Sequence, residues 1–171
     1  MSPELVLLVY LFLAVVLMIM IFNGIFYGAM YTKVPKRTLK KILALGKLDE
    51  GMTVYDLGAG FGRIMLAVAE SGARTVGYEI DRAKVYWVQQ QIKRKMLWNA
   101  SIVHDNLLNA DLSKCDVAYA YLSPPLMQKI GVKAQKEMRA GSRIISVEHK
   151  IPDWQPVYAD ENEKIFMYQK T

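Results

Sequence analysis

The segment at residues 55–63 reads YDLGAGFGR and combines an aspartate with three closely spaced glycines. Glycines at positions 58, 60 and 62 let the backbone approach a ligand closely between a strand and a helix. In a dinucleotide-binding loop the helix N-terminus faces a pyrophosphate, which the carboxylate of Asp56 would repel. The segment also lacks a third glycine three residues after the second, and no Gly-Lys-Ser/Thr ending follows. The sequence therefore excludes both a dinucleotide fingerprint and a P-loop.

A ligand with a cationic amino group and a carboxylate fits this loop better. The amine can face Asp56 through water or backbone, while the carboxylate can face the amides of the loop. Glu79 follows 23 residues later at the end of the next expected strand, where it can accept hydrogen bonds from both hydroxyls of an unphosphorylated ribose. Asp105 and Asn106 follow a third strand and can read an adenine edge. Amino acid, ribose and adenine together describe S-adenosylmethionine.

Strands and helices that would position these residues alternate along the chain. Expected strands lie at 52–57, 73–80, 101–104, 116–122 and 142–149, expected helices at 39–48, 62–71, 82–98 and 126–139, and a closing antiparallel hairpin at 156–159 and 164–170. This alternation predicts an α/β fold with a doubly wound, mostly parallel, Rossmann-like sheet. Such sheets bind ligands at the carboxyl ends of their strands, where the residues above lie.

The N-terminal segment has a different composition. Residues 5–22 read LVLLVYLFLAVVLMIMIF without a charge, and the apolar run continues to Tyr31, long enough to cross a bilayer as a helix. A cleaved signal peptide is disfavoured because no basic residue precedes the apolar run, and the charged residue that does precede it, Glu4, is acidic. A buried soluble helix is disfavoured because the run has no polar face. We expect a single-pass transmembrane helix that contacts the lipid bilayer through residues 5–31.

Basic residues are concentrated just after this apolar segment. Six of the 22 lysines and arginines lie at residues 33–47, whereas residues 49–171 hold 16 basic and 15 acidic residues. A basic cluster at this position places the C-terminal domain in the cytoplasm and favours anionic lipid headgroups. The nearly neutral remainder disfavours a nucleic-acid partner.

Three regions follow from these observations. We expect a transmembrane anchor at 1–31, a basic juxtamembrane lead-in helix at 32–48 and a catalytic domain at 49–171. Cys115 is the only cysteine, which excludes a disulfide framework and a cysteine-based zinc site, and no metal site is expected.

Several motifs resemble one enzyme family. DLGAGFGR, GYEID and HDNL resemble the nucleoside-binding motifs of class I S-adenosylmethionine-dependent methyltransferases. Residues 34–171, and above all the YLSP and IPDWQP segments, are similar to the small archaeal protein-lysine methyltransferases. Mitochondrial relatives of that subgroup carry an N-terminal membrane segment and methylate lysines of inner-membrane proteins. The resemblance implies S-adenosylmethionine as cofactor, bound by Asp56, Gly58, Ala59, Gly60, Gly62, Glu79, Ile80, Asp105 and Asn106.

The sequence departs from the subgroup at two places. Phe61 stands where an acidic residue is usual within the glycine loop, and Lys36 and Arg37 stand where a Thr-Pro-like pair is common. Residues 123–125 also resemble the Asp/Asn-Pro-Pro-Tyr motif of amino-methylating nucleic-acid enzymes. Leu126 replaces the aromatic residue that would stack the target base, which disfavours that alternative.

Methyl transfer from a sulfonium is an in-line displacement, for which the protein mainly supplies orientation and desolvation. A lysine amine must be neutral to attack, and a narrow aromatic channel would lower its pKa by desolvation. Tyr121, Ser123 and Pro124 follow the fourth strand, where the methyl group should point. We expect these three to be the catalytic residues, with Tyr121 and nearby backbone carbonyls orienting the amine. Trp154 is expected to form another wall of the aromatic channel.

These expectations combine into a methyltransferase that modifies lysines of proteins at or in the membrane, on its cytoplasmic side. The short domain leaves little room for a lid, and an open cofactor mouth suits a side chain presented by a partner. Three alternatives remain. The enzyme would methylate a membrane small molecule such as a lipid amine or quinone, the chain would be a silent cofactor-binding adaptor, or it would methylate nucleic acid along a basic stripe.

Overall fold

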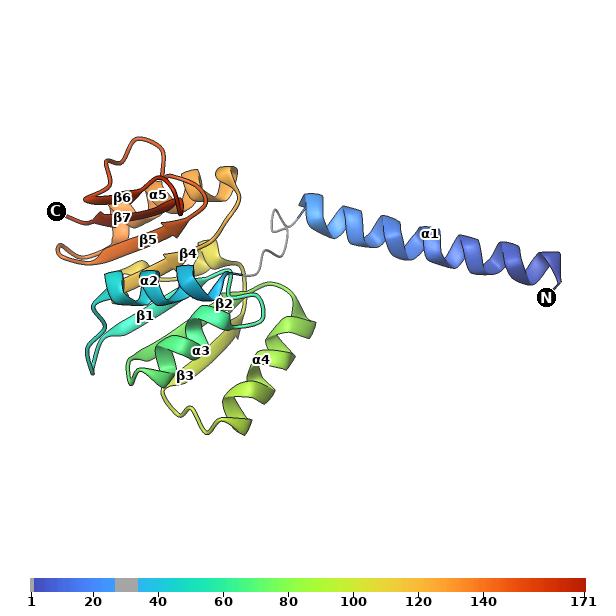
Figure 1. Cartoon of the computed structure of the whole chain (residues 1–171), viewed down its shortest axis with the longest axis horizontal. Helices are drawn as coiled ribbons and strands as arrows, with labels where there is room; N and C mark the ends of the chain where they lie inside the picture. Colours follow the sequence, from blue (N-terminus) through green and yellow to red (C-terminus); the bar gives the residue numbers. More distant parts are fainter. Residues whose placement is uncertain (1, 27–33) are drawn as a thin grey trace. The chain divides into compact units, whose positions relative to one another are not determined.

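The computed structural model describes residues 2–26 and 34–171, with side chains described for residues 2–19 and 34–171. The chain divides into two compact units, residues 1–30 and residues 31–171, and each is considered by itself. The second unit contains a mixed α/β sheet with helices on both faces (Figure 1).

Within residues 34–171 the sheet has seven strands in the order β3-β2-β1-β4-β5-β7-β6. The strands are β1 (Thr53–Leu57), β2 (Arg74–Glu79), β3 (Ala100–His104), β4 (Val117–Ala120), β5 (Arg143–Val147), β6 (Tyr158–Asp160) and β7 (Ile165–Gln169). Strands β1 to β5 pair in parallel, and β7 pairs antiparallel with both β5 and β6. The predicted mostly parallel sheet with a closing antiparallel hairpin is confirmed.

The strand order places one switch point in the middle of the sheet. From β1 the chain moves outward through β2 to β3, then returns to the other side of β1 to form β4. Leu57 is aligned with Tyr78 on one side and with Ala120 on the other, so the loops after β1, β2 and β4 leave the same edge of the sheet. In doubly wound sheets, this switch point is where ligands bind.

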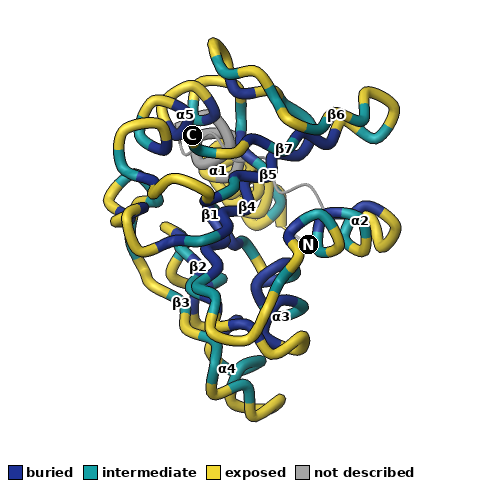
Figure 2. Tube along the Cα trace, turned by 90° about the vertical axis from the view of Figure 1, so that its left-hand side faces the viewer, coloured by how far each residue is buried: buried dark blue, intermediate teal, exposed yellow. Residues whose placement is uncertain are grey.

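Helices cover the two faces of the sheet unequally (Figures 1 and 2). The helices are α2 (Lys36–Gly46), α3 (Arg63–Glu70), α4 (Arg82–Arg94) and α5 (Pro124–Glu137), with short 3-10 turns η1 (Leu107–Asn109) and η2 (Leu112–Lys114). Buried residues of α2 and α3 pack on one face, and those of α5 pack on the other. Strand β4 is buried on both faces: Val117 and Tyr119 join the α2 side, while Ala118 and Ala120 join the α5 side.

Two helix ends differ from the sequence-based expectation. The proline pair does not precede α5 but begins it, with Pro124 at the first helical position after the N-cap residue Ser123. Proline is favoured there because its missing N–H would lack an intrahelical acceptor anyway. The expected start at residue 126 is therefore wrong. Helix α4 ends at Arg94 instead of residue 98, and Met96 adopts a positive φ of 52° just beyond it.

The lead-in helix α2 is part of the domain core. Thr38, Ile42 and Gly46 are buried, and the Tyr119 hydroxyl donates a hydrogen bond to the Ile42 carbonyl at 3.2 Å. A Cβ atom at Gly46 would lie 2.2 Å from the Tyr119 hydroxyl oxygen, so only glycine fits this contact. The helix therefore packs directly on the centre of the sheet through residues that the sequence presented as a juxtamembrane segment.

Helix α1 (Pro3–Phe26) lies in the first unit. Its described large apolar side chains are mostly exposed, with values such as 67% for Phe12 and 58% for Leu17. Among the described residues, no helix is both long and apolar enough to span a membrane. The predicted transmembrane segment at 1–31 is therefore not supported, and its residues 1 and 27–31 fall outside the described residues.

Candidate active site

Asp56 lies inside the sheet near the end of β1 and braces the glycine loop against α3. The residue is only 4% exposed, and its Oδ2 accepts a hydrogen bond from the Met65 N–H at 3.0 Å. Met65 is in the first turn of α3, where the partial positive charge of the helix favours a carboxylate. Burial raises the pKa of Asp56 to about 7, the Met65 N–H opposes this shift, and the charge of Glu79 adds to it. Such a buried carboxylate can reach a ligand through backbone or water.

The loop after β1 turns back on β2 through backbone contacts. The N–H groups of Gly58 and Ala59 both donate to the Tyr78 carbonyl, at 3.0 and 2.9 Å. Gly58, Gly60 and Gly62 all have positive φ angles, of 84°, 56° and 75°. Residues other than glycine rarely adopt positive φ angles. The three glycines therefore allow a turn that carries the backbone from β1 to α3 within five residues.

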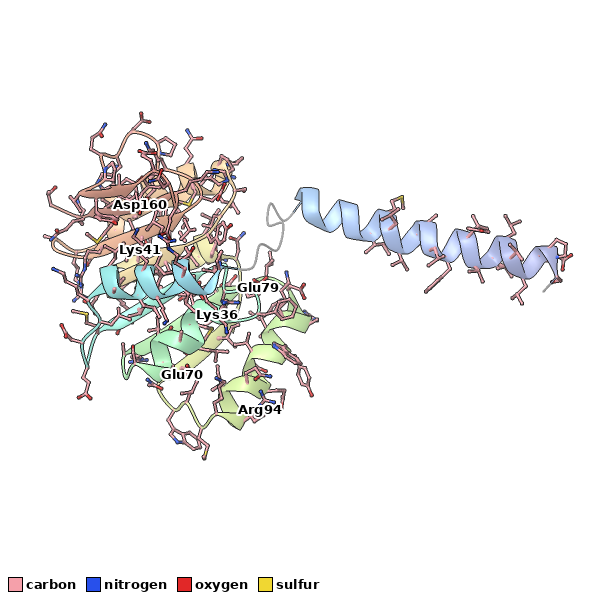
Figure 3. The ribbon with its side chains drawn as sticks, in the orientation of Figure 1. Lys36, Lys41, Glu70, Glu79, Arg94 and Asp160 are labelled. Carbon is pink, nitrogen blue, oxygen red and sulfur yellow. The ribbon has the colours of Figure 1, made fainter. Side chains whose placement is uncertain are left out.

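Glu79 ends β2 at the same edge and faces the glycine loop (Figure 3). Its Oε2 accepts from the Gly60 N–H at 2.8 Å, and its Oε1 accepts from the Asp81 N–H at 2.9 Å. Each oxygen keeps further acceptor capacity, and the carboxylate is held in one orientation by two backbone donors. An acceptor-only group fixed in this way fits the hydroxyls of a ribose. The next residue, Ile80, is 41% exposed and offers an apolar surface beside it.

Asp105 and Asn106 come to the same edge but mainly shape their own turn. The Asp105 N–H donates to the Glu79 carbonyl at 3.2 Å, which ties the loop after β3 to the end of β2. Asp105 Oδ1 accepts from the Asn106 N–H at 2.6 Å and from the Asn109 side-chain amide at 2.8 Å. Asn106 Oδ1 accepts from the Leu108 N–H at 2.9 Å. Their contact with an adenine edge stays a prediction.

The segment after β4 is short and lies at the switch point. Tyr121 is half-buried and packs against the apolar cluster on the α2 side of the sheet. The Ser123 carbonyl accepts from the Met127 N–H at 2.9 Å, whereas its side chain makes no capping bond to α5. Pro124 is exposed. These three residues lie where the sequence placed them, and their part in methyl transfer stays a prediction.

Trp154 belongs to the opposite face of the sheet. Its ring lies 5.4 Å from that of Tyr168, centroid to centroid, and packs against the cluster on the α5 side. Tyr121 packs on the α2 side, so the two aromatic residues proposed as orienting group and channel wall rest on different faces.

Sequence reasoning missed an aromatic contact beside the glycine loop. Phe61, which the sequence marks only as a departure from a motif, forms an edge-to-face contact with Trp87 of α4 at 6.5 Å between ring centroids. Both rings are exposed, by 42% and 51%. The available signal was the position of Trp87, which lies off the buried stripe formed by Val85 and Val88 and therefore had to point outward.

Part of the basic cluster is occupied by ion pairs within the domain. Arg37 Nε lies 2.9 Å from Glu163 Oε1, and Lys41 pairs with Asp160 and lies 3.6 Å from Glu163 Oε1. Lys41 and Asp160 face each other in Figure 3. The acidic residues come from β6 and the turn before β7, so these two cations hold α2 to the closing hairpin.

Comparison with known proteins gives a consistent family assignment. The model of the ANTKMT methyltransferase domain matches residues 56–158. A protein-lysine N-methyltransferase of Saccharolobus islandicus (strain REY15A) is 30% identical over 129 residues, which cover 74% of this chain and 80% of that protein. The adenine nucleotide translocase lysine N-methyltransferase of Mus musculus is 31% identical over 134 residues, which cover 74% of this chain and 56% of the mouse protein.

The chain therefore spans little more than half the length of the mouse relative. Among solved structures, an RNA methyltransferase from Salinibacter ruber in complex with S-adenosyl-L-homocysteine has a TM-score of 0.75 and 30% identity, covering 82% of this chain and 93% of that chain. The chain belongs to the ANTKMT methyltransferase domain family of class I methyltransferases, whose cofactor is S-adenosylmethionine.

Proposed function

We propose that this protein transfers methyl groups to lysine side chains of proteins that lie in or at a membrane. One observation carries the proposal: the glycine loop after β1, with its braced carboxylates, lies next to the short segment 121–124 after β4 at the switch point of the sheet. The names of the archaeal and mouse relatives, both lysine N-methyltransferases, support lysine as the acceptor.

The residues of this chain have to orient and desolvate an amine, because S-adenosylmethionine supplies an already electrophilic methyl group. A lysine ammonium has an ordinary pKa of about 10.4, and apolar surroundings favour the neutral form. Leu122 is buried and Tyr121 half-buried at the end of β4, so this segment offers such surroundings. We assign the Tyr121 hydroxyl and the carbonyls of residues 121 and 122 to holding the amine N–H groups.

The shortness of the connections supports a macromolecular substrate. Only three residues separate Ala120 of β4 from Pro124 of α5, and ten separate Val147 of β5 from Tyr158 of β6. Within residues 34–171, neither connection contains a helix that would cover the ligand edge. A small molecule is usually enclosed by its enzyme, whereas a protein side chain arrives with its own surroundings.

We also infer that the protein works at a membrane surface. The exposed apolar side chains of α1 form a patch of the kind that marks an interaction site, and lipid is the partner that suits an apolar helix of this composition. Lys36, Lys40 and Lys47 are exposed and suit anionic headgroups. Association with a membrane, with the domain on its cytoplasmic side, is the arrangement that we propose.

Methylation of RNA is a second candidate, because a solved relative of similar length, 30% identical, is named an RNA methyltransferase. The nearly balanced charge of residues 49–171 gives this candidate less support.

The test is transfer of labelled methyl groups from S-adenosylmethionine by the full chain, added to membranes of its own source. Protein, lipid and RNA are then separated, and the labelled protein is hydrolysed. We expect label in methylated lysine, and we expect Glu79→Gln to reduce it strongly, with Glu161→Gln, an exposed change in the β6–β7 turn, as the matched control. Label in RNA or in extracted lipid instead would overturn the proposal, as would cofactor binding with no label in any fraction.

A further inference from the structure

Helix α4 exposes an unusual combination of side chains. It carries four basic residues and no acidic residue over Arg82–Arg94. Between them lie Tyr86 and Trp87, which are 65% and 51% exposed. Large aromatic side chains are seldom left in water on a helix that already has a buried stripe, so this surface suggests a partner.

Helical geometry places these groups on one side. Successive residues are rotated by about 100° around a helix axis, and Val85 and Val88 define the buried direction. The opposite side is shared by Ala83 and by five larger residues that we call the α4 outer face: Tyr86, Trp87, Gln90, Lys93 and Arg94. Arg94 is labelled on this helix in Figure 3, near its C-terminal end.

The cations of the α4 outer face remain available to a partner. Lys84 lies 3.4 Å from Asp81, and Lys95 pairs with Glu70, but both lie outside this face. Arg94 shares a hydrogen bond of 2.7 Å with Gln91. Among the described residues, no carboxylate forms an ion pair with Lys93 or Arg94. The face therefore combines two aromatic rings with two charges that are not neutralised within the domain.

We propose that the α4 outer face docks on the surface of an anionic lipid bilayer. Tyr and Trp have apolar bodies and polar tips and concentrate at the level of lipid headgroups. Lys93 and Arg94 would bind the anionic headgroups, because basic residues close to such a surface are attracted to its negative charge. The charge of the face selects anionic lipid, and the exposed apolar side chains of α1 in the same chain favour lipid over RNA.

Docking would orient the cofactor edge. Phe61 stands inside the glycine loop and contacts Trp87, so the α4 outer face is continuous with the loop that follows β1. A bilayer against this face would hold the ligand edge close to membrane-embedded acceptors. The inference deepens the proposed function by giving the enzyme an orientation, but lipid docking itself does not require lysine to be the acceptor.

The experiment uses the full chain with vesicles of brominated phosphatidylcholine and phosphatidylserine, which quench tryptophan fluorescence at the bilayer. The chain has three tryptophans, at positions 87, 98 and 154. One variant, Trp98→Phe with Trp154→Phe, keeps only Trp87, and another, Trp87→Phe with Trp98→Phe, keeps only Trp154. We expect Trp87 to be quenched at least twofold more than Trp154, which packs against Tyr168 on the other face. Equal quenching, or failure to bind the vesicles, would overturn the proposal.

A matched charge reversal identifies the groups responsible. Lys93→Glu with Arg94→Glu should abolish the quenching of Trp87. Lys129→Glu with Lys136→Glu changes the same charge on exposed positions of α5 and should leave it intact. Binding of a single-stranded RNA that is lost only in the α4 variant, with Trp87 unquenched by lipid, would assign the face to nucleic acid instead. Circular dichroism of each variant establishes that it is folded, and none of these readouts depends on methyl transfer.

Discussion

Helices α2 and α4 are both cationic, yet they use their charges in opposite ways. Each carries four basic residues and no acidic one. In α2, Arg37 and Lys41 pair with Asp160 and Glu163, and the helix is locked to the sheet through Tyr119. In α4, Lys93 and Arg94 stay exposed beside two aromatic rings. Each cation of a basic helix is therefore bound within the domain or left exposed to a partner according to whether the fold places an acid beside it, and Lys36 and Lys40 of α2 are left exposed.

Asp56 differs from both sets of cations, because its ionisable group is neither ion-paired nor exposed but buried inside the sheet. Its pKa is raised from 3.8 to about 7, so the folded state holds its proton more tightly than the unfolded chain. The stability that this protonation provides is present below pH 4 and is lost as the pH rises toward 7. Asp56→Asn should therefore stabilise the ligand-free protein at pH 8 by up to about 4 kcal/mol and by little at pH 4.

Urea unfolding of both proteins at several pH values measures this difference. Calorimetry should show that the same variant binds S-adenosylmethionine more weakly, since stabilising a charged functional position commonly reduces function. A stability difference that does not change with pH would contradict the assignment of the shift to burial of Asp56.

Gly46→Ala tests how much the close packing of α2 against Tyr119 contributes to the stability of the domain. The added Cβ would overlap the buried Tyr119 hydroxyl oxygen, so we expect a loss of about 1–3 kcal/mol in the free energy of unfolding. Gly51→Ala is an informative control, because nothing lies within 4 Å of its Cβ and only its positive φ of 91° is strained. Equal losses for the two variants would show that overlap with Tyr119 is not the cause.

Asp160→Asn removes the acid that α2 needs and should have a smaller effect on stability than Gly46→Ala. The pairing with Lys41 holds the pKa of Asp160 below its usual range. Its contribution is therefore present above pH 4 and is lost as the pH falls through the folded pKa. Thermal unfolding at pH 7 and at pH 3 should show a larger difference between the two proteins at the higher pH. Lys129→Gln, an exposed change on α5, serves as the reference.

Charge reversal on the α4 outer face should have the smallest effect on folding. Lys93→Glu with Arg94→Glu removes no ion pair among the described residues, so we expect a change within about 0.5 kcal/mol in detergent. The same variant should lose lipid docking. A large loss of stability would mean that this face packs on another part of the protein, and the contrast with α2 would fail.

The sheet, and the meeting of the glycine loop with Glu79 at one edge of it, were predictable because their signals are local. Alternating apolar segments, the glycines at 58, 60 and 62, and the carboxylate of Glu79 follow directly from short stretches of sequence. The pairing of Lys41 with Asp160 was not predictable, because 119 positions separate the two residues. The contact of Phe61 with Trp87 likewise depends on how α4 packs beside the loop.

Local signals also failed where one residue type has two uses. Proline ends a strand and disrupts a helix interior, yet Pro124 begins α5 because the first helical position needs no N–H donor. For Asp105 and Asn106 the outcome is open: a polar pair after a strand can cap a turn as well as contact a ligand, the turn bonds are formed here, and the ligand contact stays a prediction.

The ion pairs between α2 and the closing hairpin also constrain the order in which the protein can be completed during synthesis. At about 5–20 residues per second, the ribosome needs about 6–24 s to advance the 119 positions from Lys41 to Asp160. Throughout that interval α2 lacks its acidic partners. During the first part of it, α2 also lacks strand β4, which carries Tyr119. The N-terminal helix α1 therefore leaves the ribosome long before the domain behind it can close.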